Sequence, residues 1–258
     1  MRFSGFVKIA GLSGVAAALT LSLIGCGAAA SSNLAVTQGN WAFTATSSAK
    51  IVNKQVASFV LGGNLSQSGD KLSGTLTVDQ SGCIAPQTIA FTGTVKGSDI
   101  TLTSAAFDGN VISVTGTANK DSLTGSYTVT GGCADDGTIS ANVVPSISGT
   151  WTGTVFVSDS PATISVALTQ SSSASENGSF VLSGTATYTG SVCEASATIT
   201  EGSSISGSQL TLNLNTGVTY VATLNSTTAP ASAQGDYDST SSECASSDGI
   251  QSVTLAKQ

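Results

Sequence analysis

Seven residues, Leu72-Ser73-Gly74-Thr75-Leu76-Thr77-Val78, alternate between two kinds of side chain. Aliphatic residues and glycine take every second place, and serine or threonine takes the places between them. Because successive side chains of a β-strand point to opposite faces, this alternation predicts a strand with one buried face and one face in water. The stretch from Leu123 to Val129 has the same order, so the pattern indicates antiparallel sheets.

The second half of the chain repeats the first half. Gly39-Asn40-Trp41 matches Gly149-Thr150-Trp151 at an offset of 110 residues, and several later positions match at the same offset. Each repeat has the usual size of a domain with a single hydrophobic core. The predicted domains are residues 39–148 and residues 149–258.

Eight segments of the first repeat are predicted to be strands, because they are rich in β-branched residues and are separated by turn residues. They are residues 40–47, 56–66, 72–79, 87–96, 99–107, 110–119, 122–130 and 137–144. The short connections predict an up-and-down meander, and eight strands are enough to close a small barrel. The predicted fold class is therefore all-β, with two tandem antiparallel eight-stranded barrel-like domains. A pair of β-sandwiches is the alternative.

A glycine recurs on the predicted buried face, in copies of one motif such as LSGTL, FTGTV, VTGTA and LTGSY. Glycine at such a place indicates strong strand bending or close packing of another side chain, as at the corners of barrels. The alternative is that the glycines clear space for a ligand.

The N-terminus has the features of a signal peptide. Arg2 and Lys8 precede a mostly apolar run from Ile9 to Ile24. This run has the length of a signal-peptide core and is too short to span a bilayer comfortably. The alternative is an uncleaved membrane anchor.

Leu23-Ile24-Gly25-Cys26 resembles the lipobox of bacterial lipoproteins. The resemblance implies cleavage before Cys26 and a lipid on its thiol, so that residues 1–25 are a signal peptide and residues 26–38 a lipidated tether. Two or three acyl chains make a stable anchor. The expected partner is thus a membrane of the bacterial cell envelope. Gly27 is not the aspartate of the enterobacterial inner-membrane retention signal, which favours the outer membrane, on its periplasmic or surface face.

The other four cysteines are predicted to form one disulfide in each domain. Cys83 pairs with Cys133, and Cys193 pairs with Cys244, because the two pairs repeat at offsets of 110 and 111 residues. In a meander, the loops that hold the first pair lie at the same end of the barrel. An exported protein is in an oxidising compartment, where disulfides persist. Two pairs of reduced thiols are the alternative.

The composition argues against several classes of function. The chain has no histidine, so the commonest general base and the commonest zinc ligand are missing. The part after residue 25 has six lysines and fifteen acidic residues, whereas a nucleic-acid partner needs a basic surface. Asp236 and Asp238 flank Tyr237 and are expected to face water together, unlike a glycosidase pair in a cleft. We therefore expect no nucleic-acid partner, metal, cofactor or catalytic activity.

Gly39-x-Trp41 at the start of an eight-strand meander resembles the start of lipocalins and avidins. The resemblance implies a small barrel in each repeat. The later tryptophans of the avidin biotin site have no counterpart, since Trp41 and Trp151 are the only two in the chain. Biotin binding is therefore not implied, and we expect each tryptophan to plug the floor of its barrel.

The sequence predicts a non-catalytic cell-envelope lipoprotein that serves as a structural or interaction module. One alternative is a carrier that binds a small apolar ligand in a barrel cavity, and the other is a carbohydrate-binding protein. Large inward side chains argue against the carrier, and the small number of aromatic residues argues against carbohydrate binding. The residues expected to fill the first barrel are Phe43, Phe91, Leu102, Ile112, Val114, Tyr127 and Ile139.

Overall fold

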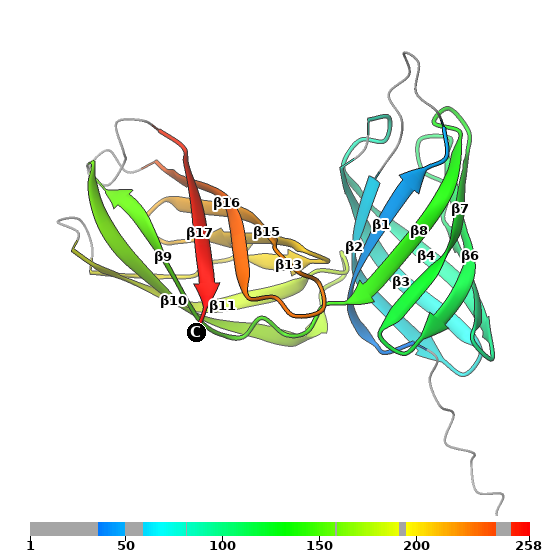
Figure 1. The fold of residues 1–258 in the computed structure, drawn as a ribbon, viewed down its shortest axis with the longest axis horizontal. Coiled ribbons are helices and arrows are strands. Elements are labelled where there is room, and N and C mark those ends of the chain that lie inside the picture. The colour runs from blue at the N-terminus through cyan, green and yellow to red at the C-terminus, as the bar shows by residue number, and fades with distance from the viewer. Residues whose placement is uncertain (1–35, 50–58, 81, 158, 191–194, 241–248) are drawn as a thin grey trace, which may run out of the picture. The chain divides into compact units, whose positions relative to one another are not determined.

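The computed structural model describes residues 36–49, 59–80, 82–157, 159–190, 195–240 and 249–258. Every regular element in these residues is a β-strand, and the strands form two closed eight-stranded antiparallel barrels (Figure 1). The predicted all-β barrel fold is confirmed, and the sandwich alternative is excluded. No helix that is long and apolar enough to cross a membrane occurs in the described residues.

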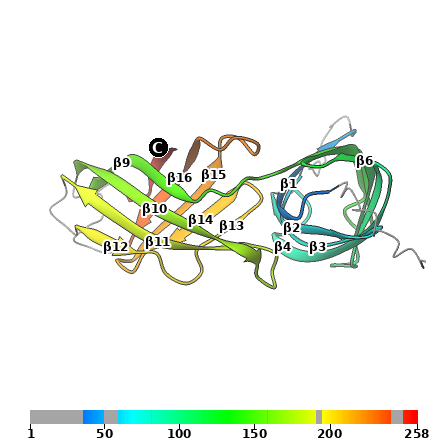
Figure 2. The same cartoon turned by 90° about the horizontal axis from the view of Figure 1, so that it is seen from below.

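Barrel 1 is an up-and-down meander in which each strand pairs with the next and β8 closes on β1. Figure 2 shows its strands arranged in a ring. The strands are β1 (Gly39–Ser47), β2 (Phe59–Ser68), β3 (Lys71–Gln80), β4 (Gln87–Lys96), β5 (Asp99–Ser104), β6 (Val111–Asn119), β7 (Ser122–Thr130) and β8 (Asp135–Val143). All eight predicted strands are present.

Two strands of barrel 1 have bounds that differ from the predicted ranges. The predicted strand 99–107 ends at Ser104, because the chain then makes a tight turn in which Asp108 and Gly109 both have positive φ. The first residues of the predicted strand 56–66 lie outside the described residues, and the described part of β2 starts at Phe59.

Barrel 2 closes in the order β10-β9-β17-β16-β15-β14-β13-β11, and the β10–β11 pairing completes the ring. Its strands are β9 (Gly149–Val157), β10 (Ser160–Ala174), β11 (Phe180–Thr189), β12 (Ser196–Thr198), β13 (Ser204–Ser206), β14 (Gln209–Asn213), β15 (Val218–Leu224), β16 (Ser232–Ser239) and β17 (Gln251–Lys257). The short strand β12 pairs with β11 beside β13.

One strand of the repeat is broken in barrel 2. The offset of 110 residues places the counterpart of β4 at residues 197–206, where β12 and β13 are separated by a turn. The Ser203 N–H donates to the Thr200 carbonyl across this turn at 3.3 Å, and Gly202 between them has a φ of 85°. The counterpart of Phe91 is Glu201, which lies in the turn and is exposed. Barrel 2 therefore lacks a phenylalanine that barrel 1 buries.

A tryptophan is buried at the same place in each barrel. Trp41 and Trp151 are at most 1% exposed. The Trp41 Nε1–H donates a hydrogen bond to the Thr37 carbonyl, and the Trp151 Nε1–H donates to the Ile147 carbonyl, both at 2.8 Å. Each buried indole thus forms a hydrogen bond with the main chain four residues before it, at the start of its barrel. This position agrees with the predicted plug.

The segment before each barrel is also built into it. The Val36 N–H donates to Gln67 Oε1, and the Ile147 N–H donates to Gln170 Oε1, both at 3.0 Å. Val36 and Ile147 are fully buried. Val36, which lies within the predicted tether of residues 26–38, is therefore part of the core of barrel 1.

The recurring glycines lie against the main chain of the neighbouring strand. A Cβ atom on Gly93 would collide with the Thr101 carbonyl oxygen, and one on Gly125 would collide with the Thr115 carbonyl oxygen. The predicted close packing is present, but the neighbour is a carbonyl group rather than another side chain. Since main chain occupies these places, the glycines do not clear them for a ligand.

We expect Gly93→Ala and Gly125→Ala each to lower the free energy of unfolding by roughly 1–3 kcal/mol, because the strands must move apart to admit a methyl group. Gly132→Ala is the matched control, since a Cβ atom on Gly132 would lie 4.0 Å from Asn110 Oδ1, which is an ordinary van der Waals contact. Urea unfolding measures all three variants. An equal loss at Gly93 and Gly132 would contradict the close strand packing.

Candidate functional site

The interior of barrel 1 is occupied by its own side chains. All seven residues that were expected to fill it are at most 2% exposed. Phe59, which was not among them, places its ring edge-on to Tyr127, with the ring centroids 5.1 Å apart. Such a pair adds to the energy of apolar burial. The side chains inside barrel 1 therefore pack against one another and fill the interior.

The end of barrel 1 opposite Trp41 is held by a disulfide. Cys83 in the β3–β4 loop is bonded to Cys133 in the β7–β8 loop, as predicted. The Cys133 N–H donates to Oδ1 of Asn110, a buried residue of the β5–β6 loop, at 2.9 Å. Three loops are therefore tied together at this end. Two of the predicted features, the Cys193–Cys244 disulfide and the lipid-bearing Cys26, lie outside the described residues.

A cluster of polar side chains links β1, β7 and β8 near the same end. The Tyr127 hydroxyl donates to Asp135 Oδ2 at 2.5 Å, and the Ser47 hydroxyl donates to Asp135 Oδ1 at 2.6 Å. Burial raises the pKa of Tyr127, and the hydrogen-bonded carboxylate of Asp135 raises it further. The phenol is therefore a neutral donor at physiological pH. Both oxygens of the Asp135 carboxylate accept a hydrogen bond, so this residue of β8 links the side chains of β1 and β7.

The carboxylates of β16 lie on the outer face of barrel 2. Asp236 and Asp238 are exposed on either side of the buried Tyr237, as predicted. They therefore form a solvated surface rather than a pair in a cleft. In the described residues, no three histidine, cysteine, aspartate or glutamate side chains gather closely enough to hold a metal ion.

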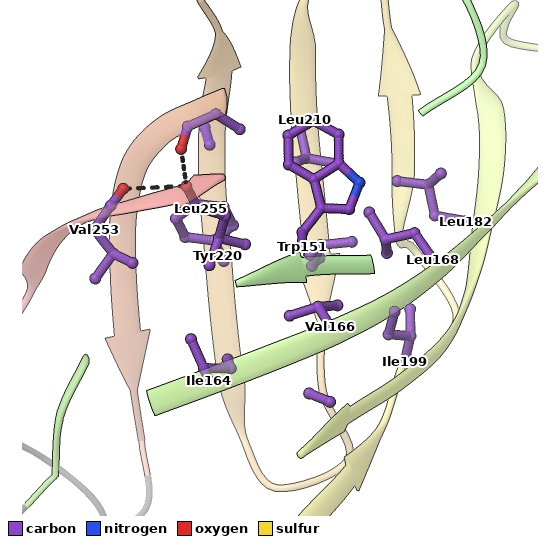
Figure 3. Close-up of a cluster of buried hydrophobic side chains, with 14 of the residues drawn as sticks. Trp151, Ile164, Val166, Leu168, Leu182, Ile199, Leu210, Tyr220, Val253 and Leu255 are labelled. Atoms are coloured by element: carbon purple, nitrogen blue, oxygen red, sulfur yellow. Dashed lines mark hydrogen bonds between the residues drawn. The ribbon is translucent and has the colours of Figure 1, made fainter. Parts of the chain in front are cut away.

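Barrel 2 is filled by a different set of residues. Figure 3 shows Trp151, Val166 and Leu210 among aliphatic side chains from several strands. The Tyr220 hydroxyl is shared between the carbonyls of Ala233 at 2.8 Å and Val253 at 3.1 Å. Burial raises the pKa of Tyr220, so this phenol is also neutral.

A small apolar cavity remains inside barrel 2. Strand pairing places Gly153 and Ala162 where barrel 1 has Phe43 and Phe59. The cavity has a volume of about 10 Å³. That is about the space of one water molecule and far below the size of an ordinary ligand pocket. Its lining residues are Ile164, Val166, Leu212, Leu214, Val218, Tyr220, Tyr237, Val253 and Leu255.

No protein-family model and no curated protein matches this chain. A solved structure to which it is similar is described, provisionally, as AttH of Nitrosomonas europaea. The two are 6% identical, the match covers 86% of this chain and 92% of that chain, and the TM-score is 0.28. The two-barrel fold of this protein is defined by its own strand pairing.

Proposed function

We propose that this protein is a non-catalytic lipoprotein of the bacterial cell envelope whose two barrels serve as a structural or interaction module. The observation that carries the proposal is that the barrel interiors are occupied by side chains of the chain itself. A barrel that acts as a carrier needs an interior space for its ligand. Filled barrels leave the outer surfaces as the places where a partner binds.

The proposed anchor is the lipid on Cys26. Its support is the lipobox-like sequence, preceded by a short apolar run and two basic residues. Two or three acyl chains hold a protein stably at a bilayer. The proposed location is the outer membrane, on its periplasmic or surface face. Nucleic acid is not proposed as a partner, because acidic residues outnumber basic ones in the chain.

One observation favours a second candidate, a carrier of a small apolar ligand. Barrel 2 has an apolar cavity, although it has room for about one water molecule. Stoichiometric binding of an apolar fluorescent probe by barrel 2 would favour this candidate. Carbohydrate binding has less support, since the exposed large hydrophobic side chains of the described residues include a single aromatic one, Phe156.

The lipid anchor is tested on membrane-extracted protein. We expect intact-mass analysis to show cleavage before Cys26 and the added mass of two or three acyl chains. Cys26→Ala is expected to move the protein from the detergent phase to the aqueous phase in detergent partitioning, because no acyl chain is attached. The control, Cys83→Ala with Cys133→Ala, should stay in the detergent phase. An uncleaved, unacylated chain would refute the anchor.

A further inference from the structure

Main-chain groups of the two barrels are in direct contact within one compact unit, Leu34–Gln258. The side chain of Asn40 in β1 is buried and forms two hydrogen bonds with Gly207 in the β13–β14 turn. Its Nδ2 donates to the Gly207 carbonyl at 2.9 Å, and its Oδ1 accepts from the Gly207 N–H at 2.6 Å. A Cβ atom on Gly62 of β2 would collide with the Ser206 carbonyl oxygen, so a larger residue has no room there.

A small pocket lies beside this contact. Its volume is about 70 Å³, which is larger than the cavity inside barrel 2 and has room for several water molecules. It is too small for a whole ligand of ordinary size, so it suits a single chemical group. Strands β2 and β3 form one wall, and residues 206–209 form the other. The lining residues are Val60, Leu61, Gly62, Thr77, Asp79, Ser206, Ser208 and Gln209.

Asp79 is the ionisable residue among these lining residues. It is the extra residue of a β-bulge, because Val60 pairs with Gln80 while Leu61 pairs with Val78. A bulge re-aims a side chain, and bulges are frequent next to functional sites. The bulge therefore gives this carboxylate a place in the wall of the pocket.

The Asp79 carboxylate is partly removed from water without a replacement partner. Within the described parts of the chain, no hydrogen bond or ion pair reaches it. Burial raises the pKa of Asp79, and neither a hydrogen bond nor a nearby charge contributes to the shift. Carboxylates in such surroundings are usually paired. A cation within roughly 4–6 Å would offset the lost hydration.

We propose that this pocket binds a primary alkylammonium group. An ammonium has three N–H donors and no acceptor, so it matches a carboxylate surrounded by hydroxyl oxygens. Asp79 accepts one of its hydrogen bonds, and the hydroxyls of Thr77 and Ser208 in the same pocket supply further acceptors. Val60 gives an apolar wall for the alkyl chain.

The charges of the chain also favour a cationic ligand. The formal net charge is −7, so the field of the whole protein attracts cations. A divalent metal ion fits this pocket less well, because such ions prefer several carboxylate or carbonyl oxygens, and the pocket offers one carboxylate. The site deepens the proposed interaction role, on which it rests, and does not depend on the lipid of Cys26.

The probe for the test is n-butylamine, which is an ammonium ion at pH 7. We expect one saturable site on the full-length protein in detergent, followed by NMR at the amides of Thr77 and Ser208 on the two walls. Asp79→Asn should weaken binding about tenfold or more, because the charge is lost and the shape is kept. The matched control, Asp238→Asn, removes an exposed carboxylate of β16 and should change binding less than about twofold.

Two further probes separate charge from apolar contact and identify the source of the ammonium. The neutral analogue n-butanol should bind at least about tenfold more weakly than n-butylamine. Nα-acetyl-lysine amide carries the same ammonium on a peptide unit. Binding as tight as that of n-butylamine would assign the site to a lysine side chain of another polypeptide, and binding about tenfold weaker would assign it to a free amine. Either result supports the site.

The stability of the variant provides an independent readout. Asp79→Asn should not lower the free energy of unfolding, because the raised pKa of Asp79 means that folding disfavours its charged form. Absence of saturable binding, equal weakening by Asp79→Asn and Asp238→Asn, equal binding of n-butanol, or a loss of stability in Asp79→Asn would overturn the proposal. None of these outcomes changes the mass or partitioning of the lipidated chain, so the two proposals fail separately.

Discussion

Trp151→Ala is expected to lower the free energy of unfolding of barrel 2 by roughly 3–5 kcal/mol. The indole is 1% exposed, so its loss leaves a cavity at the end of the barrel. It also leaves the Ile147 carbonyl without its 2.8 Å hydrogen bond from Nε1. A loss of this size is a large part of the stability of an ordinary domain, about 5–15 kcal/mol. Urea unfolding followed by far-UV circular dichroism measures it.

The repeat supplies controls for this experiment. Trp41→Ala should have a similar effect on barrel 1, because the Trp41 indole is buried and bonded in the same way. The chain has two tryptophans, so the one that remains reports by its fluorescence on the other barrel. Val181→Ala should change stability by less than about 0.5 kcal/mol, since Val181 is half exposed. A loss below about 1 kcal/mol at Trp151 would contradict the described plug.

Removal of the disulfide by Cys83→Ala with Cys133→Ala is expected to lower the free energy of unfolding of barrel 1 by about 4 kcal/mol. The bridge joins residues 50 apart in sequence, and without it the unfolded chain has many more conformations. Denaturant unfolding of the double variant measures the loss. Stability equal to that of the wild type would contradict a role of the bridge in holding the barrel.

The second predicted disulfide supplies the comparison. Cys193→Ala with Cys244→Ala should have a similar effect on barrel 2, because the predicted loop is about as long. Peptide mapping without reduction should recover Cys83 with Cys133 and Cys193 with Cys244. Recovery of Cys83 with Cys193 would overturn both the pairing and the division into two repeats.

Residue alternation was enough to locate the strands of barrel 1. In stretches such as residues 72–78, aliphatic residues alternate with hydroxyl residues, and this period of two has a direct meaning for a half-buried strand. The same periodicity placed Asp236 and Asp238 outside and Tyr237 inside, as the structure has them. The Cys83–Cys133 bridge was predictable as well, because meander topology brings odd-numbered loops to one end.

Other contacts were missed because their partners have no fixed spacing in sequence. Gln67 and Gln170 accept equivalent hydrogen bonds, from the main-chain N–H groups that precede the two barrels. They are 103 residues apart rather than 110, so the repeat offset does not relate them. Asn110 was missed because its partner, the Cys133 amide, is 23 residues away in another loop. A lone asparagine in a turn has no pattern that indicates such a partner.

The sequence by itself determined the two repeats, the alternation that makes them all-β, the strands of barrel 1 and its cysteine pair, because each of these depends on local periodicity or on a recurring offset. Tertiary structure alone decided the carbonyl groups that face Gly93 and Gly125, the broken counterpart of β4, and the hydrogen bonds of the Gln251 side chain to the main chain of Phe156. These features depend on how far neighbouring strands separate and on which main-chain groups meet across them. Such distances are set by the closure of the whole barrel rather than by any one stretch of residues.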